Sequence, residues 1–183
     1  MTRPRVLALV ALLALAAAIY AVATPSGTSM ADEAGGKNIQ IKDDCDPTDP
    51  AWNNVGGCAL ARGDVTLAEF AGQNDSPLAD AVIGHQAWRN DPSYIEIRPD
   101  DTVRVDNVGG RVHTLTEVAH FGGGIAPNPA LNEGLTLAEE CRQANNILPG
   151  GRAHLSGLAV GIHRFQCCFH PWMRALVKVE HNH

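Results

Sequence analysis

The chain has 183 residues, of which 45% are hydrophobic and 19% are charged, so its composition is typical of a globular protein and not of a disordered one. Lys and Arg number 14 and Asp and Glu number 20, which gives a formal net charge of -6. Binding to nucleic acid depends on clustered basic residues that neutralise phosphates, so this charge argues against a nucleic-acid partner.

The N-terminus has the pattern of an export signal. Arg3 and Arg5 precede an apolar run at 6–23, and the small residues Ala21 and Ala23 suit a signal peptidase, so residues 1–23 are a predicted signal peptide. The run is also just long enough to span a bilayer, so an uncleaved membrane anchor is the alternative. In both cases we expect the folded part to be periplasmic or extracellular, where disulfides persist.

Short helices are expected in the segments that follow. The small, Gly-rich residues 24–37 predict a flexible tether, and residues 38–93 predict an N-terminal extension packed on the main domain. The sequence Thr-Leu-Ala-Glu occurs twice, and each copy can form a capping box, which predicts helices at about 66–72 and 136–147. A further helix is expected at 77–90.

From Tyr94 onward the hydrophobic pattern changes to period two, which is typical of strands that are buried on one face. Strands are predicted at 94–98, 103–106, 112–118, 153–158, 163–167 and 174–180. Turns rich in Gly and Pro separate them. We therefore expect an all-β fold, a Greek-key β-sandwich at 94–183 with a helical insertion at 121–151.

Three possible metal ligands lie close together near the C-terminus. Cys167, His170 and Met173 have the spacing C-x-x-H-x-x-M. A thiolate and a thioether combined with imidazole select copper, and two His with one Cys and a weak axial Met form an electron-transfer copper site. A structural zinc site has no use for the Met.

The second imidazole must come from elsewhere in the chain. His113 is the best candidate, because it follows Gly109-Gly110 and begins a β-rich segment that can lie beside the strand of Cys167. His120, beside a Gly-rich loop, is its main rival. A structural role for either histidine is the alternative interpretation.

The run from Phe165 to Arg174 resembles the ligand loop of the cupredoxins, the small blue copper proteins, and among them is most similar to that of amicyanin. The segment from Asp100 to Asn107 and the pair His113-Thr114 look like the region of the family's first His. This resemblance implies an eight-stranded sandwich, one type 1 copper per chain and one-electron transfer. It also implies that redox proteins dock near His170, where Pro171 and Trp172 could belong to an apolar patch. Packing of Trp172 in the core is an equally good interpretation. Many cupredoxins have Asn where this chain has Thr114, whose hydroxyl could tie the loops together instead.

Four of the five cysteines remain if Cys167 binds copper. Cys45 and Cys58 are a plausible local pair, and Cys141 with Cys168 would staple the inserted helix to the ligand strand. The alternative for Cys168 is a free, buried thiol.

The leading hypothesis is an exported blue copper protein that carries single electrons between redox partners and is not itself an enzyme. One alternative is a copper carrier or storage protein that holds Cu(I) with the same ligands. Another is an extracellular interaction domain without redox activity.

Overall fold

The computed structural model describes residues 37–73, 88–125 and 135–181. The predicted export segment and all but the last residue of the predicted tether lie outside these ranges. Within them, no helix has the length and hydrophobicity that a membrane crossing requires.

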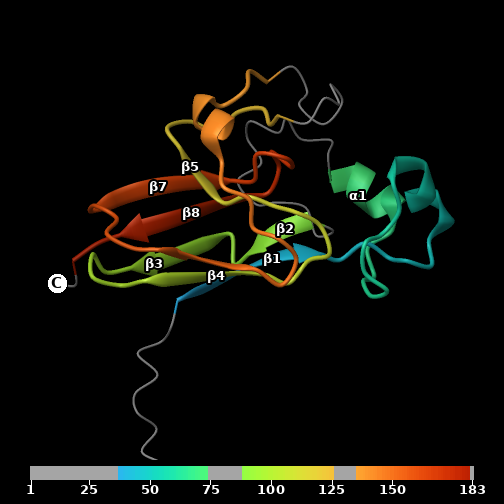
Figure 1. Cartoon of the computed structure of the whole chain (residues 1–183), viewed down its shortest axis with the longest axis horizontal. Helices are drawn as coiled ribbons and strands as arrows, with labels where there is room; N and C mark the ends of the chain where they lie inside the picture. The colour runs from blue at the N-terminus through green and yellow to red at the C-terminus, as the bar shows by residue number, and fades with distance from the viewer. Residues whose placement is uncertain (1–36, 74–87, 126–134, 182–183) are drawn as a thin grey trace, which may run out of the picture. The chain divides into compact units, whose positions relative to one another are not determined.

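Within the described ranges, eight strands form two four-stranded sheets (Figure 1). The first sheet has the order β2-β1-β4-β6 and consists of β1 (Asn38–Asp43), β2 (Trp88–Asp91), β4 (Val103–Asn107) and β6 (Arg152–Leu155). The second has the order β3-β8-β7-β5 and consists of β3 (Tyr94–Ile97), β5 (Thr116–Val118), β7 (Gly161–Gln166) and β8 (Arg174–Val179). β1 runs parallel to β4 and β3 runs parallel to β8, while the other neighbours are antiparallel. The predicted all-β sandwich is confirmed.

The period-two pattern places one face of each central strand in the core. In β4, Val103 and Val105 are buried whereas Arg104 between them is exposed. Val103 belongs to one apolar cluster with Phe165 and Val177 of the opposite sheet. The two sheets therefore pack face to face and exclude water between them.

Residues 38–93, expected as an extension, contain two strands of the first sheet. β1 lies between β2 and β4, and its residues Ile39 and Ile41 are fully buried. β1 was not among the predicted strands. The helix expected at 77–90 is wrong for residues 88–90, which belong to β2, and the rest of it lies outside the described residues.

The two predicted capping boxes have different outcomes. α1 (Leu67–Gln73) is confirmed, with Thr66 Oγ1 accepting from Glu69 N at 3.2 Å and a Glu69 side-chain oxygen accepting from Thr66 N at 2.9 Å. The helix expected at 136–147 is wrong, because only a short 3-10 helix, η2 (Glu139–Gln143), forms there. The backbone of residues 136–138 instead exchanges hydrogen bonds with Gly123, which leaves the Thr side chain unable to cap a helix. The side chain of Asp49 caps the N-terminus of a further 3-10 helix, η1 (Pro50–Val55), by accepting from Ala51 N.

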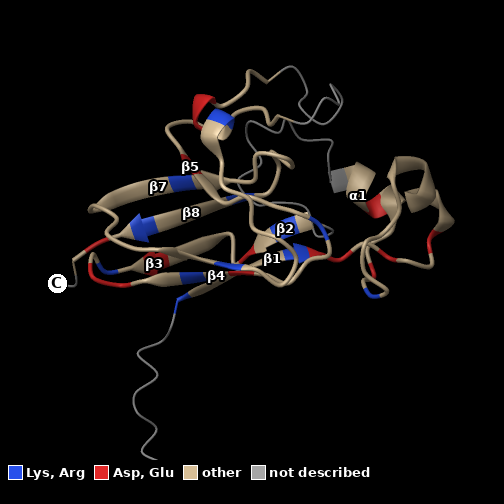
Figure 2. Ribbon diagram, viewed as in Figure 1, with Lys and Arg blue, Asp and Glu red and all other residues tan. Residues whose placement is uncertain are grey.

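Basic and acidic residues both occur along the strands of the first sheet (Figure 2). Lys42 of β1 pairs with Asp91 of β2, and Asp106 of β4 pairs with Arg104 and with Arg152 of β6. Such exposed pairs contribute little to stability, about 0 to 1 kcal/mol each. The free energy of folding therefore comes mainly from the apolar layer beneath them.

Replacing Ile41 by Ala should lower the free energy of unfolding by roughly 2–5 kcal/mol, because it leaves a cavity in a fully packed core. The matched control is Ile162→Ala on β7, where the side chain is 47% exposed and the loss should stay below about 1 kcal/mol. Denaturant titration of the metal-free protein measures both. Equal losses in the two variants would contradict a central position for β1.

Candidate metal centre

His113 is positioned by an isolated antiparallel bridge to Ile147, just before β5. Its backbone N donates to Ile147 O at 3.1 Å, and Ile147 N donates to His113 O at 2.7 Å. The side-chain amide of Asn107 also donates to Ile147 O, at 2.8 Å, which connects this bridge to the end of β4. The His113 side chain is fully buried. Its rival from the sequence, His120, is exposed and does not belong to the cluster.

The other ligand candidates lie on the tight loop between β7 and β8. Met173 N donates to His170 O at 2.8 Å, and Cys167 N donates to Met173 O at 2.9 Å, so the loop is closed by its own backbone. The side chain of Arg174 donates to Pro171 O at 2.8 Å and reinforces the loop from within. Cys167 and Met173 are fully buried and share one apolar cluster, and His170 is half-buried.

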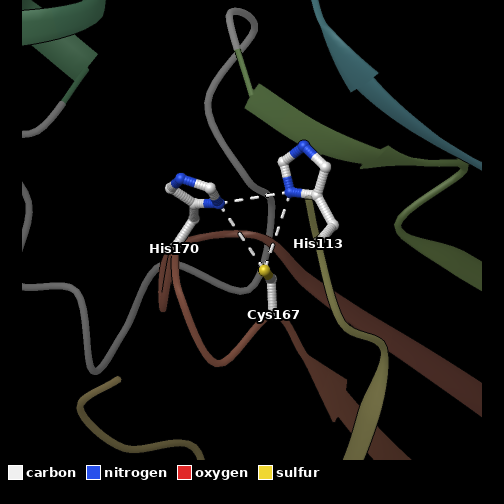
Figure 3. Close-up of side chains that lie close together, drawn as sticks. All are labelled: His113, Cys167 and His170. Carbon is white, nitrogen blue, oxygen red and sulfur yellow. Dashed lines mark hydrogen bonds between the residues drawn. The ribbon is translucent and has the colours of Figure 1, made fainter. Parts of the chain in front are cut away.

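Three of the four predicted ligands converge (Figure 3). Cys167 Sγ lies 3.7 Å from His113 Nδ1 and 3.6 Å from His170 Nδ1, and the two Nδ1 atoms are 3.2 Å apart. In Figure 3 both imidazoles turn the same nitrogen toward the sulfur. In sequence, His113 is 54 positions from Cys167 and 57 positions from His170, and the fold brings the three side chains together.

The size of this triangle fits a single metal ion. Donor atoms about 2.0 to 2.3 Å from one ion and about 120° apart are separated by about 3.5 to 3.8 Å. The observed separations are 3.2 to 3.7 Å. One sulfur and two imidazole nitrogens at these separations are a donor set that suits copper.

The electrostatics of the cluster favour a thiolate. Burial raises the pKa of the Cys167 thiol, but hydrogen bonds with His113 and His170 and their positive charge lower it to about 5. Burial lowers the pKa of His113, whereas hydrogen bonds to Asp43 and Cys167 raise it to about 9. Because the thiolate is the form that binds metals, Cys167 is prepared for ligation without help from a further base.

Asp43, at the end of β1, is a site residue that the sequence analysis missed. Its Oδ1 lies 2.6 Å from His113 Nε2, and both side chains are buried. Burial raises the pKa of Asp43, but the hydrogen bond with His113 and the backbone N–H groups of Arg111 and Gly110 lower it below its ordinary value. The signal that could have found it is the alternation Ile39, Ile41, Asp43, which places a carboxylate on the core face of a strand.

Thr114 ties the two ligand segments together. Its backbone N donates to Cys167 Sγ at 3.4 Å, and its hydroxyl accepts from Cys168 N at 2.8 Å. The residue after the first histidine therefore holds both the ligand sulfur and the next peptide of the ligand loop, as the sequence analysis suggested for its hydroxyl.

Aromatic rings surround His170. Trp88 of β2 stacks on its imidazole, with ring centroids 5.8 Å apart and planes inclined by 14°, and Trp172 meets it edge-on at 5.4 Å. Trp52 and Phe70 extend the cluster behind Trp88 at 5.2 Å each. Trp172 and its neighbour Pro171 are buried, so the interpretation of Trp172 as a core residue is confirmed and these two residues do not form an exposed apolar patch.

Both expected cysteine pairs are disulfides in the structure. Cys45 is bonded to Cys58, Cys141 is bonded to Cys168, and Cys167 is free and buried. The second disulfide connects η2 to the residue that directly follows the candidate ligand. The alternation along the chain directs the two neighbouring sulfurs to different partners.

No family model and no curated protein matches the chain. Among solved structures, a novel purple cupredoxin from Nitrosopumilus maritimus matches with 17% identity and a TM-score of 0.41, covering 79% of this chain and 99% of that one. Amicyanin from Paracoccus versutus matches with 22% identity and a TM-score of 0.35, covering 58% and 86%. A Cu(I) form of an amicyanin variant matches with 18% identity and a TM-score of 0.34, covering 50% and 73%.

The structural neighbours are thus cupredoxins, the class that the ligand loop resembles. The identities and TM-scores of these three matches are low. The function is therefore inferred from the residues of the site.

Titration with a thiol reagent should find one thiol per chain in protein unfolded without reductant and five after reduction. In Cys167→Ala the unreduced value should fall to zero. Two or more thiols before reduction, or one in the Cys167→Ala protein, would mean that the cysteines pair differently in solution.

Proposed function

We propose that His113, Cys167 and His170 bind one copper ion, with Met173 as a weak axial ligand, and that the protein carries single electrons between redox partners. The observation that supports this most strongly is the convergence of one buried sulfur and two imidazole nitrogens within 3.2 to 3.7 Å of one another. When bound, copper supplies the exchange between its Cu(II) and Cu(I) states, and the chain supplies a fixed set of ligands that suits both.

Burial of the ligands favours electron transfer over delivery of copper. His113, Cys167 and Met173 are each fully buried, and the ligand loop is closed by backbone hydrogen bonds. Handing a copper ion to another protein requires the acceptor's ligands to reach the metal, which this burial opposes. An electron needs no such contact, and a rigid site rearranges little when the charge changes.

We further propose that the electron leaves through His170 and that the partner proteins dock there. Of the three converging residues, His170 is the only one that is not fully buried. The two disulfides suit a protein that works in the periplasm or outside the cell. The export pattern at 1–23 supports the same location, with attachment to a membrane only if that segment is retained.

Adding Cu(II) to the metal-free protein should load one ion per chain and produce an intense visible absorption from charge transfer between sulfur and copper. Cys167→Ala should remove this absorption completely, because the thiolate is its source. The control is His154→Ala on β6, a histidine outside the cluster, which should keep both the absorption and the copper content. Absorption and metal analysis of the same samples provide the measurement.

A Cys167→Ala protein that keeps the colour would rule out this ligand set. A wild-type protein that binds no copper would instead favour an interaction domain without redox activity. Rapid transfer of copper to a competing chelator, combined with slow electron exchange, would favour the copper carrier.

Replacing Met173 by Leu should preserve copper binding and raise the reduction potential. Leu has nearly the volume of Met, so the buried position tolerates it, while the loss of a weak donor disfavours Cu(II). Redox titration of both proteins measures the change. An unchanged potential would mean that Met173 packs in the core without acting on the metal.

A further inference from the structure

The N-terminal strand β1 reaches the candidate metal centre through one side chain. Asp43 is its last residue, and the Asp43 carboxylate accepts three hydrogen bonds. Oδ1 lies 2.6 Å from His113 Nε2, and Oδ2 accepts from the backbone N of Gly110 at 2.7 Å and of Arg111 at 2.8 Å. Both Asp43 and His113 are excluded from water, so no solvent molecule competes for these bonds.

These contacts determine which nitrogen of His113 keeps its proton when a metal binds. A carboxylate that already accepts two backbone N–H groups is an acceptor for the third contact as well, so His113 Nε2–H is the donor. The opposite ring nitrogen, Nδ1, is the one that faces Cys167 and His170. A metal would therefore replace the proton on Nδ1, while Asp43 keeps the proton on Nε2 and the lone pair of Nδ1 points to the metal.

The turn at Gly109 packs closely against the Asp43 carboxylate. A side chain at Gly109 would place its Cβ only 2.6 Å from Asp43 Cγ, so glycine is required at this position for the turn to pack against the Asp43 carboxylate. β1 itself is held between β2 and β4. The same side chain thus fixes the turn that precedes His113 and the orientation of the His113 ring.

We propose that Asp43 is a positioning residue for the copper site, which fixes the ring of His113 and favours Cu(II) over Cu(I). This inference rests on the proposed function. A carboxylate hydrogen-bonded to a ligating histidine increases the basicity of that ligand, and loss of such partners typically costs 10–100-fold in metal affinity. The added negative charge favours the more highly charged metal state, so Asp43 should lower the reduction potential.

The test compares Asp43→Asn with Asp44→Asn. The control removes a carboxylate from the neighbouring position, where Asp44 pairs with Arg89 and is partly exposed. In Asp43→Asn the affinity for Cu(II) should fall about 10–100-fold and the affinity for Cu(I) less, and each tenfold difference between the two losses raises the potential by about 59 mV. In Asp44→Asn the shift should be several times smaller. Equal shifts in the two variants would overturn the proposal.

A second measurement needs no variant and keeps the proposal testable even if Asp43→Asn fails to fold. Nitrogen-15 NMR of the metal-free and Cu(I)-loaded wild-type protein reports the protonation of each His113 nitrogen. We expect a proton on Nε2 that exchanges slowly with solvent in both states, and metal on Nδ1 in the loaded state. A His113 that lacks the Nε2 proton, or exchanges it freely, would overturn the role of Asp43.

The two ideas fail in distinguishable ways. If the wild-type protein binds no copper, the proposed function is wrong. If it binds copper with a sulfur charge-transfer band but Asp43→Asn keeps the wild-type potential and copper affinity, the proposed function stands and the role of Asp43 is wrong.

Discussion

Asp43, His113 and Cys167 are three buried ionisable side chains that contact one another through the His113 ring. The burial of each is stabilised by its contact with the next. A single charge in such surroundings would be strongly unfavourable, whereas hydrogen-bonded neighbours of opposite charge compensate for the loss of water. The order along this row is carboxylate, imidazole and sulfur. The fold has to hold three separate segments in register, namely the end of β1, the residue before β5 and the loop after β7, for this compensation to exist.

The N-terminal part of the chain acts on both histidines of the cluster. From β1, Asp43 holds the ring of His113, and from β2, Trp88 stacks on the ring of His170. Trp52 of η1 and Phe70 of α1 support Trp88 from behind. Residues 38–93, expected as an extension of the sandwich, therefore contribute to the surroundings of the site, and their aromatic rings pack against its half-buried histidine.

Much of the site could be predicted from sequence because its chemistry is local. Cys167, His170 and Met173 lie within seven residues of one another. With Cys167 as a ligand, the other four of the five cysteines remain for two disulfides. The alternation Ile39, Ile41, Asp43 places the Asp43 carboxylate on the core face, but its contact with His113 depends on the parallel pairing of β1 with β4, which no local pattern specifies. The second capping box failed for a related reason, since backbone pairing with Gly123 overrides the local preference for a helix.

Cys167 and Cys168 are adjacent in the chain but have different fates, since one stays a thiol and the other is cross-linked to Cys141. If the chain matures in the oxidising compartment proposed for it, a disulfide formed by Cys167 instead of Cys168 would consume the proposed ligand sulfur. If β7 folds before the disulfide forms, the strand directs Cys168 and not Cys167 toward Cys141. A metal ion that bound Cys167 early would protect its sulfur equally well. Under the proposed function, biogenesis would therefore depend on the relative timing of folding, oxidation and metal uptake.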